Sequence, residues 1–297
     1  MSKWRRAVPW WLRIGAKIVL ARVPVPYGFW NRLGLFELGD MNEPRRALDT
    51  VLMHATTAQV LDDSRPPRFR RQSADFAVLE LGPGDSLFTG VIAKALGASR
   101  SWLVDVGAFA TMEPWAYDAL LKVLAAEGYD PFPEVSDVER LKDECGIVYL
   151  TRGLDSLREM PDACVDFCFS NAVLAQVRRE EFEALLGETR RVLKPNGVCV
   201  HRVDLRDHLG GALNNLRFDE ATWEGRLFRE SGFYTNRIRF AEMLDIFERA
   251  GFTCHTPRVA RWDRLPTPRA KLAEPFRQMP EDSLLVSGFD AVLRPRL

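Results

Sequence analysis

The chain has 297 residues, 46% hydrophobic and 28% charged, which is typical of a globular protein with one large domain or two smaller ones. Its 41 basic and 41 acidic residues balance, so no overall field attracts nucleic acid, and we expect no nucleic-acid partner. Five cysteines without a C-x-x-C pair favour free thiols in a reducing, cytoplasmic compartment. Cys164 and Cys168 would lie about 13 Å apart on one strand, so we expect no metal site.

The first 36 residues carry basic side chains and no acidic one, interleaved with tryptophans and aliphatic residues. The pattern favours a helical extension that packs on the rest of the chain. The alternative is a segment that lies on the surface of an anionic membrane, with peripheral contact at its inner face. Basic residues interrupt the apolar run, so we expect neither a secretory signal nor a membrane span. With a helical stretch near 43–61, the segment forms an expected N-terminal extension over residues 1–70.

From residue 71 to 297, apolar runs alternate with helical patterns and are taken as one domain. The expected strands are 76–81, 101–106, 146–150, 164–170, 197–204, 252–259 and 284–293, and the expected helices are 86–97, 114–127, 137–144, 179–193 and 239–250. Continuously apolar strands indicate burial on both faces. The pattern predicts an α/β fold with a doubly wound sheet.

Two segments break this alternation. Residues 205–238 are rich in glycine, asparagine and aromatics and are expected to form an inserted lid or substrate region. Aromatic and guanidinium groups there, such as Trp223, Phe233, Arg237 and Arg239, would suit a polar acceptor. Residues 260–282, rich in proline, are expected to be a long connection before the last strand.

The strand expected at 76–81 runs into the sequence Glu-Leu-Gly-Pro-Gly-Asp-Ser at residues 80–86. Gly82 and Gly84 let the backbone turn sharply and approach a ligand closely. Asp105, at the end of the next expected strand, is placed to accept hydrogen bonds from ribose hydroxyls. The pattern predicts a site for a nucleotide-type cofactor.

The residues around the glycines distinguish a dinucleotide from a cationic cofactor. In a dinucleotide turn the third small residue would fall at Leu87. The carboxylates of Glu80 and Asp85 stand where a pyrophosphate would need positive charge. The turn therefore favours a cationic ligand, and an NAD-dependent oxidoreductase remains the alternative enzyme.

Residues 80–86 resemble motif I of the class I S-adenosylmethionine-dependent methyltransferases, E/D-x-G-x-G-x-G, with Ser86 in place of the third glycine. Residues 166–174 resemble the motif at the end of that family's fourth strand, and residues 190–197 resemble its turn from helix to fifth strand. The resemblance implies a Rossmann-like, seven-stranded, mostly parallel sheet with helices on both faces and an antiparallel last strand. It also implies S-adenosylmethionine as cofactor. The residues it implies for cofactor binding are Glu80, Gly82, Pro83, Gly84, Asp85, Asp105, Gly153, Leu154, Ser170 and Asn171.

Methyl transfer requires an acceptor atom in line with the sulfonium methyl and, for some acceptors, a base. Many relatives have a histidine where this chain has Gln176, which cannot act as a base. The candidates for a catalytic role are His201, Asp204 and His208, although a core histidine and a structural ion pair would look the same.

The chain also loosely resembles methyltransferases of bacterial surface-polysaccharide and lipid-linked glycan pathways. This implies methylation of an oxygen, less readily a nitrogen, in a small-molecule or lipid-linked glycan acceptor. A non-catalytic scaffold that keeps the fold is the alternative from another class.

Overall fold

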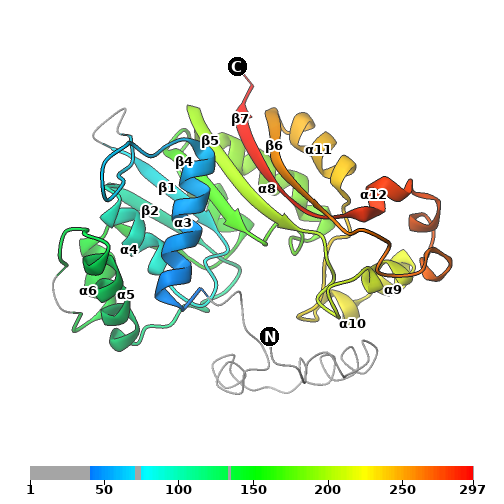
Figure 1. Cartoon of the computed structure of the whole chain (residues 1–297), viewed down its shortest axis with the longest axis horizontal. Coiled ribbons are helices and arrows are strands. Elements are labelled where there is room, and N and C mark those ends of the chain that lie inside the picture. Colours follow the sequence, from blue (N-terminus) through cyan, green and yellow to red (C-terminus); the bar gives the residue numbers. More distant parts are fainter. Residues whose placement is uncertain (1–40, 71–74, 133–134, 297) are drawn as a thin grey trace.

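The computed structural model describes residues 41–70, 75–132 and 135–296, so the basic aromatic segment 1–36 lies outside the described residues. A seven-stranded sheet runs through the centre of the molecule (Figure 1). Its strands are β1 (Ala77–Leu81), β2 (Arg100–Val104), β3 (Ile147–Leu150), β4 (Val165–Asn171), β5 (Leu193–Asp204), β6 (Phe252–Arg261) and β7 (Val286–Pro295). The order is β3-β2-β1-β4-β5-β7-β6, and only β7 runs antiparallel to its neighbours. The predicted fold class is confirmed.

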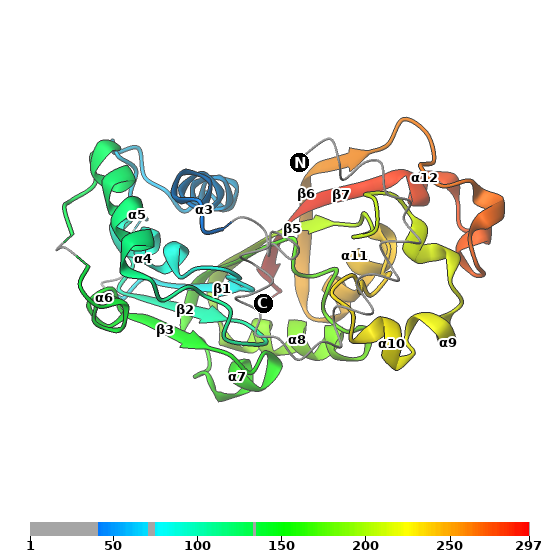
Figure 2. The ribbon, with the colours of Figure 1, turned by 90° about the horizontal axis from the view of Figure 1, so that it is seen from below.

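Helices cover both faces of the sheet, as the view from below shows (Figure 2). One face carries α3 (Pro44–Ala58), α4 (Phe88–Ala95), α5 (Pro114–Ala126) and α6 (Val138–Glu144). The other carries α7 (Leu154–Glu159), α8 (Arg179–Val192) and α11 (Phe240–Arg249). Side chains alternate along β4, so Phe167 and Phe169 face the α3 layer while Cys168 faces the α8 layer. This explains why β4 is apolar at successive positions.

The helix expected near 43–61 is present as α3 and completes the core. Its buried residues recur at helical spacing, from Ala47 and Leu48 through Val51 to Ala58. They pack with residues of β4, β5, α4 and α5 in one continuous cluster. The helix within the expected extension 1–70 is thus part of the layer that covers the sheet.

The segment that resembles the family's turn into the fifth strand lies partly within β5, which begins at Leu193. Gly197 is not among the positive-φ glycines of the described chain. A Cβ on Gly197 would lie 2.7 Å from Cγ of Leu193. Close approach of the Leu193 side chain, rather than backbone conformation, explains the glycine.

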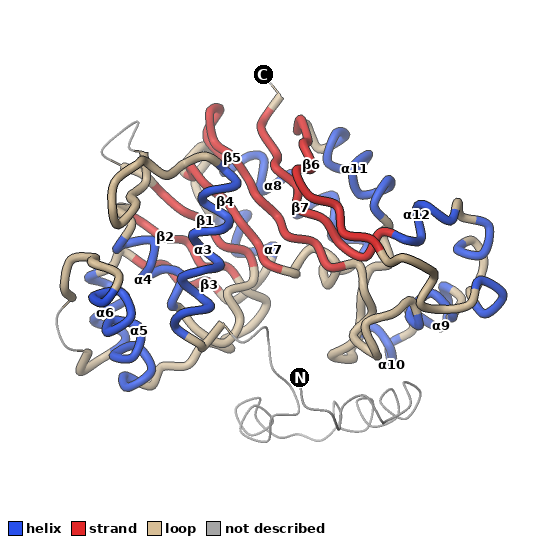
Figure 3. Tube along the Cα trace, in the orientation of Figure 1, coloured by secondary structure: helices blue, strands red, loops and turns tan. Residues whose placement is uncertain are grey.

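A lid lobe consists of residues 205–238 and 262–285 and lies at the opposite end of the molecule from α5 and α6 (Figure 1). It contains α9 (Glu220–Trp223), α10 (Arg226–Arg229), α12 (Glu281–Leu285) and 3₁₀ turns at Asn214–Arg217, Arg269–Lys271 and Phe276–Gln278. Loops connect these short helices (Figure 3). The N–H of Ala273 donates to the carbonyl of Leu216 at 2.9 Å, which joins the two segments. The region expected as a long connection therefore forms half of the lobe.

The lid lobe has its own small core, and the expected acceptor-binding residues lie inside it. Trp223 and Phe233 are fully buried, and the indole N–H of Trp223 donates to the carbonyl of Thr235. Arg237 is buried over the Trp223 ring. The expectation that these side chains present a surface to an acceptor is wrong, because the lobe needs them as its core.

Hydrogen bonds from the Arg239 side chain hold the lid lobe against the sheet. Its guanidinium is almost fully buried and donates to the carbonyls of Leu205, Leu284 and Val286, at 3.1, 3.1 and 2.6 Å. Burial lowers the pKa of Arg239 to about 10, so the group remains charged at neutral pH. The guanidinium is therefore a structural tie and is not available to a phosphate or carboxylate ligand.

His54 is a fully buried histidine on α3, 5.2 Å from the Phe169 ring centroid. Neither ring nitrogen has a hydrogen-bond partner among the described residues. Burial, assisted by the charge of Arg202, lowers the pKa of His54 to about 3. The folded protein thus holds a neutral imidazole, whereas the unfolded chain binds a proton below about pH 6.5.

This difference predicts a loss of stability in acid that depends on His54. Because the folded-state pKa is depressed, its contribution is complete above about pH 6.5 and falls by about 1.4 kcal/mol per pH unit below it. The free energy of unfolding in urea should be measured for His54→Leu and for wild type at pH 7.5 and at pH 5. As the pH falls between these values, wild type should lose about 2 kcal/mol of unfolding free energy relative to the variant. A difference that is independent of pH would contradict the assignment.

Candidate active site

The strand order reverses between β1 and β4, and in doubly wound sheets ligands bind at the carboxyl edge beside such a point. The turn after β1, the loops after β2 and β3 and the end of β4 meet there. The residues expected to bind cofactor come from these four connections, so the fold brings their backbones to one edge of the sheet.

The glycine turn after β1 has the expected sharp conformation. Gly82 and Gly84 have φ values of 71° and 69°, which side-chain-bearing residues rarely adopt. A Cβ on Gly82 would lie 2.5 Å from Cγ2 of Val173 in the turn that follows β4. The turns after β1 and β4 are therefore in direct contact, and Pro83 between the glycines is buried.

The carboxylate of Asp105 organises the site. It accepts the N–H of Gly84 at 3.0 Å on one oxygen and the N–H of Val106 at 2.7 Å on the other. Burial raises the pKa of Asp105, while these two bonds oppose that effect. A carboxylate has about four acceptor sites, so the two bonds leave room for a ligand's hydroxyls.

The loop after β3 lies against Asp105. The N–H of Gly153 donates to the backbone carbonyl of Asp105 at 2.8 Å, and Gly153 has a φ of 54°. A Cβ on Gly153 would come within 3.1 Å of Cγ1 of Val106. Gly153 and Leu154 thus adjoin Asp105, as the expected cofactor site requires.

Val106 is a residue that the sequence reasoning missed. Its side chain is 78% exposed, although it directly follows a buried strand and lies beside Asp105 and Gly153. An exposed apolar side chain next to a ribose-type carboxylate offers a surface for a flat ring. The expected strand 101–106 included Val106, whereas β2 ends at Val104, so no signal in the sequence marked this exposed position.

Glu80 does not face the edge of the sheet. It is fully buried, and the hydroxyl of Thr89 on α4 donates to its carboxyl group. Burial raises the pKa of Glu80 to about 8, so the group is mostly protonated at neutral pH. Glu80 therefore adds little negative charge to the turn at neutral pH.

Ser86, where the family motif has its third glycine, has a definite role. Its hydroxyl donates to the carbonyl of Met41 at 2.6 Å, which ties the segment before α3 to the turn. The buried Asp85 accepts the N–H of Thr111 at 2.8 Å on its backbone carbonyl. Both contacts hold neighbouring segments against the glycine turn.

Two tyrosines fix the loop between β2 and α5. The hydroxyl of Tyr149 donates to the carbonyl of Gly107 and accepts the N–H of Phe109, both at 3.0 Å. The hydroxyl of Tyr117 donates to the carbonyl of Thr111 at 2.8 Å. The loop that carries Val106 is thus held at both ends by buried or half-buried phenols.

At the end of β4, Ser170 and Asn171 differ in orientation. Ser170 is fully buried and its Oγ lies 2.8 Å from Nδ1 of His201, which is also fully buried. Asn171 is half-buried at the last position of the strand. Gln176, on the surface after this turn, donates to the carbonyl of Ala172. Of the pair Ser170 and Asn171, only Asn171 retains solvent exposure.

The three candidate catalytic residues do not converge. His201 is sealed inside the sheet's α8 face, which argues against contact with an acceptor. Asp204 is bound through both oxygens by the guanidinium of Arg206. His208 is exposed in the loop beyond β5. A catalytic role for any of them stays a prediction.

The geometry of this turn also differs from that of a dinucleotide-binding turn. Leu87, at the position of the third small residue, is fully buried and precedes α4. The close contact between helix and sheet occurs at Gly90 instead, where a Cβ would lie 2.8 Å from Cδ1 of Ile147. The turn is therefore longer than a G-x-G-x-x-G turn, which places the helix N-terminus differently.

These features, namely a doubly wound sheet with an antiparallel last strand and a glycine turn joined to a strand-end carboxylate, define a class I methyltransferase type of fold. Residues 104–201 match the family model described as a methyltransferase domain. The match begins at the end of β2, so it is independent of the glycine turn. The resemblance to S-adenosylmethionine-dependent methyltransferases is confirmed, and S-adenosylmethionine is the cofactor of that class.

Solved structures of methyltransferases are also similar to the chain. The 1,6-didemethyltoxoflavin-N1-methyltransferase of Burkholderia thailandensis, with S-adenosylhomocysteine bound, is 13% identical over 86% of this chain and 80% of that chain, with a TM-score of 0.43. A putative O-methyltransferase of Nostoc punctiforme is 12% identical over 96% of this chain and 67% of that chain, with a TM-score of 0.44. At these scores the likenesses carry no argument about function.

Comparison with curated proteins gives no match. Within residues 41–296, apart from the short gaps in the description, no helix is long and apolar enough to cross a membrane.

The contact between Gly82 and Val173 predicts that Gly82→Ala damages the site. The added Cβ meets Cγ2 of Val173 and the positive φ strains alanine, so we expect a loss of about 1–3 kcal/mol in unfolding free energy and at least about tenfold in affinity for S-adenosylhomocysteine. Urea unfolding and calorimetry measure the two effects. Gly187→Ala on α8 is the matched control, because a Cβ there meets nothing within 4 Å. Similar losses in both variants would contradict the argument.

The Tyr149 hydroxyl predicts a second effect on affinity. Tyr149→Phe removes the bonds to Gly107 and Phe109, which should loosen the loop carrying Val106 and lower affinity for S-adenosylhomocysteine several-fold, at a stability cost of about 1 kcal/mol. The control is Tyr129→Phe, since the buried Tyr129 hydroxyl has no partner among the described residues. An unchanged affinity in Tyr149→Phe would refute the role given to this phenol.

Proposed function

We propose that the protein transfers a methyl group from S-adenosylmethionine to an oxygen, less readily a nitrogen, of a small-molecule or lipid-linked glycan acceptor. The observation that carries the proposal is the junction of Gly84, Asp105 and Gly153, which presents a carboxylate and close-lying backbone at the switch point of the sheet. The fold and the family match support methylation in general, and the acceptor class goes beyond them.

In this proposal the cofactor's ribose hydroxyls bind the free acceptor sites of Asp105. Its adenine lies by Val106 and Leu154, and its methionine end lies over the glycine turn near Asp85 and Asn171. The sulfonium and ammonium groups suit a turn with two carboxylates. A pyrophosphate would be repelled by the same two groups.

Exposed apolar side chains favour an acceptor with an apolar portion. Met112 and Trp115 are 40% and 71% exposed, and both follow Thr111, whose N–H binds the Asp85 carbonyl in the glycine turn. Val106 and Met112 in the loop after β2, and Trp115 at the start of α5, thus expose apolar side chains on the connection that contacts the glycine turn. A lipid-linked acceptor fits this surface better than a free sugar, since the aromatics of the lid lobe are buried.

The protein's contribution to the reaction is then mainly alignment of acceptor and methyl group. If the acceptor hydroxyl must lose its proton, Asp204 and His208 are the groups nearest in the chain to the end of β5. Both oxygens of Asp204 bind the guanidinium of Arg206, so the proposal assigns the role of base to His208. The basic segment 1–36 would bring the cytoplasmic protein to an anionic membrane that carries the acceptor.

Two alternatives compete with this proposal. An NAD-dependent oxidoreductase is opposed by the position of Gly90 and the acidic turn. A non-catalytic scaffold would keep the fold and lose turnover, and the intact contacts of Asp105 count against it.

Asp105→Ala tests the proposal directly. The substitution removes the carboxylate that would hold the ribose, so affinity for S-adenosylhomocysteine should fall by about 10- to 100-fold, as expected for lost hydrogen bonds to a charged group. Calorimetry with S-adenosylmethionine, S-adenosylhomocysteine and NAD measures this, and methyl transfer from labelled donor to a lipid extract should fall in parallel.

The exposed Asp63 supplies the control, because Asp63→Ala removes an equivalent charge far from the glycine turn. Binding of NAD without binding of either S-adenosyl compound would reject the proposal. Tight S-adenosylmethionine binding with no transfer to lipid, glycan or small-molecule fractions would favour the scaffold.

A further inference from the structure

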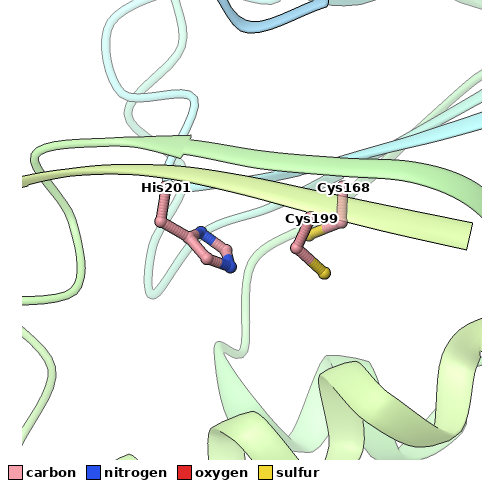
Figure 4. Close-up of side chains that lie close together, drawn as sticks. All are labelled: Cys168, Cys199 and His201. Carbon is pink, nitrogen blue, oxygen red and sulfur yellow. The ribbon is translucent and has the colours of Figure 1, made fainter. Parts of the chain in front are cut away.

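Two cysteines and a histidine form a compact cluster on the α8 face of the sheet (Figure 4). Cys168 on β4 and Cys199 on β5 are directly paired in the parallel register, and His201 lies two positions further along β5. All three side chains point to the same side of the two strands. One ligand atom from each lies within 4.8 Å of the others, and all three residues are fully buried.

The His201 ring is oriented as a metal-binding imidazole is. Its Nδ1 lies 2.8 Å from Oγ of Ser170, while its Nε2 is buried and has no hydrogen-bond partner among the described residues. We assign the proton to Nδ1, which donates to Ser170 and leaves the Nε2 lone pair free. In histidines that bind a metal, a hydrogen bond of this kind at the ring nitrogen that does not bind the ion fixes the tautomer.

The unpartnered nitrogen needs an explanation. A buried polar atom without a partner costs about 1–3 kcal/mol. The neighbouring donors are two thiol sulfurs, which are weak hydrogen-bond partners and strong ligands for soft metal ions. A metal ion shared by the three side chains would use the lone pair that the fold leaves unsatisfied.

The number of ligands selects the ion. Within the described ranges, no fourth histidine, cysteine or carboxylate joins the cluster, and its complete burial leaves no room at the surface for water ligands. Structural zinc sites are almost always four-coordinate, and hard ions require oxygen ligands. A soft d¹⁰ ion that accepts three-coordinate sulfur and nitrogen ligation, Cu(I), fits this set.

Both sulfurs bind the ion as thiolates, because the thiolate is the metal-binding form of cysteine. Cu(I) binding therefore displaces two protons, one from each thiol, and both leave to solvent. His201 Nε2 completes the ligation as a neutral donor.

We propose that Cys168, Cys199 and His201 form a three-coordinate Cu(I) site that ties β4 to β5. This assignment does not rest on the proposed methyl transfer. Because Cys168 lies three positions before Asn171, the ion would stiffen the strand that ends at the cofactor site. Cu(I) binding should therefore raise the resistance of the protein to unfolding.

The test is equilibration of the full-length, reduced protein with Cu(I) buffered by bicinchoninate under anaerobic conditions until binding is constant. Wild type should bind one Cu(I) per chain and gain resistance to urea. X-ray absorption of this complex should show two sulfur ligands and one nitrogen ligand, a readout that requires no variant. Absence of bound copper, or a shell of oxygen and nitrogen only, would overturn the proposal.

Variants then assign the ligands. Cys199→Ser and His201→Gln should weaken Cu(I) binding by more than about 100-fold, and Ser170→Ala by about 10- to 100-fold through loss of the tautomer-fixing bond. Cys254→Ser, which alters a half-buried cysteine on β6 outside the cluster, should bind as wild type does. Circular dichroism confirms that each variant is folded. Equal loss in Cys254→Ser, or preferential binding of Zn(II) in competition, would reject the Cu(I) site.

Discussion

Asp105 is the constraint on which the geometry of the site depends. Its carboxylate joins the turn after β1 to the loop after β2, through Gly84 and Val106. Its backbone joins the loop after β3, because its carbonyl accepts the N–H of Gly153 and its own N–H donates to the carbonyl of Leu150. One residue thus sets the relative positions of three connections that would otherwise be independent loops.

The other half of the site is set by packing. Val173 occupies the space that a side chain on Gly82 would need, so the turn after β4 lies against the turn after β1. The lid lobe is then held beside this edge by the buried guanidinium of Arg239, which bonds to carbonyls from both ends of the lobe. The turns around Asp105 and the lid lobe are therefore separate units. Each is held to the same sheet by one buried ionisable group, Asp105 in the first and Arg239 in the second.

The sequence was informative where local pattern decides structure. Glycines at 82 and 84, the carboxylate at 105 and the apolar strands each follow from backbone conformation or burial within a few residues. It was less informative about orientation across elements. Glu80 was expected beside the ligand, yet strand alternation turns it toward Thr89 on α4. The aromatic residues of the lid looked like a binding surface, because composition does not distinguish a small core from an exposed face.

Pairings between strands were the other limit. The expectation of no metal site considered Cys164 and Cys168 along one strand, whereas Cys168 is paired with Cys199 on the next strand. That register, and the placement of His201 beside it, arises from the order of the sheet, which the spacing of cysteines in the chain does not contain.

A crystal structure of the protein with S-adenosylhomocysteine would show whether Asp105 and the glycine turn hold an S-adenosyl cofactor. We expect the ribose hydroxyls on the carboxylate of Asp105, with adenine against Val106 and the sulfur above the Gly82–Gly84 turn. S-adenosylhomocysteine bound elsewhere, with Asp105 still bonded only to Gly84 and Val106, would contradict it.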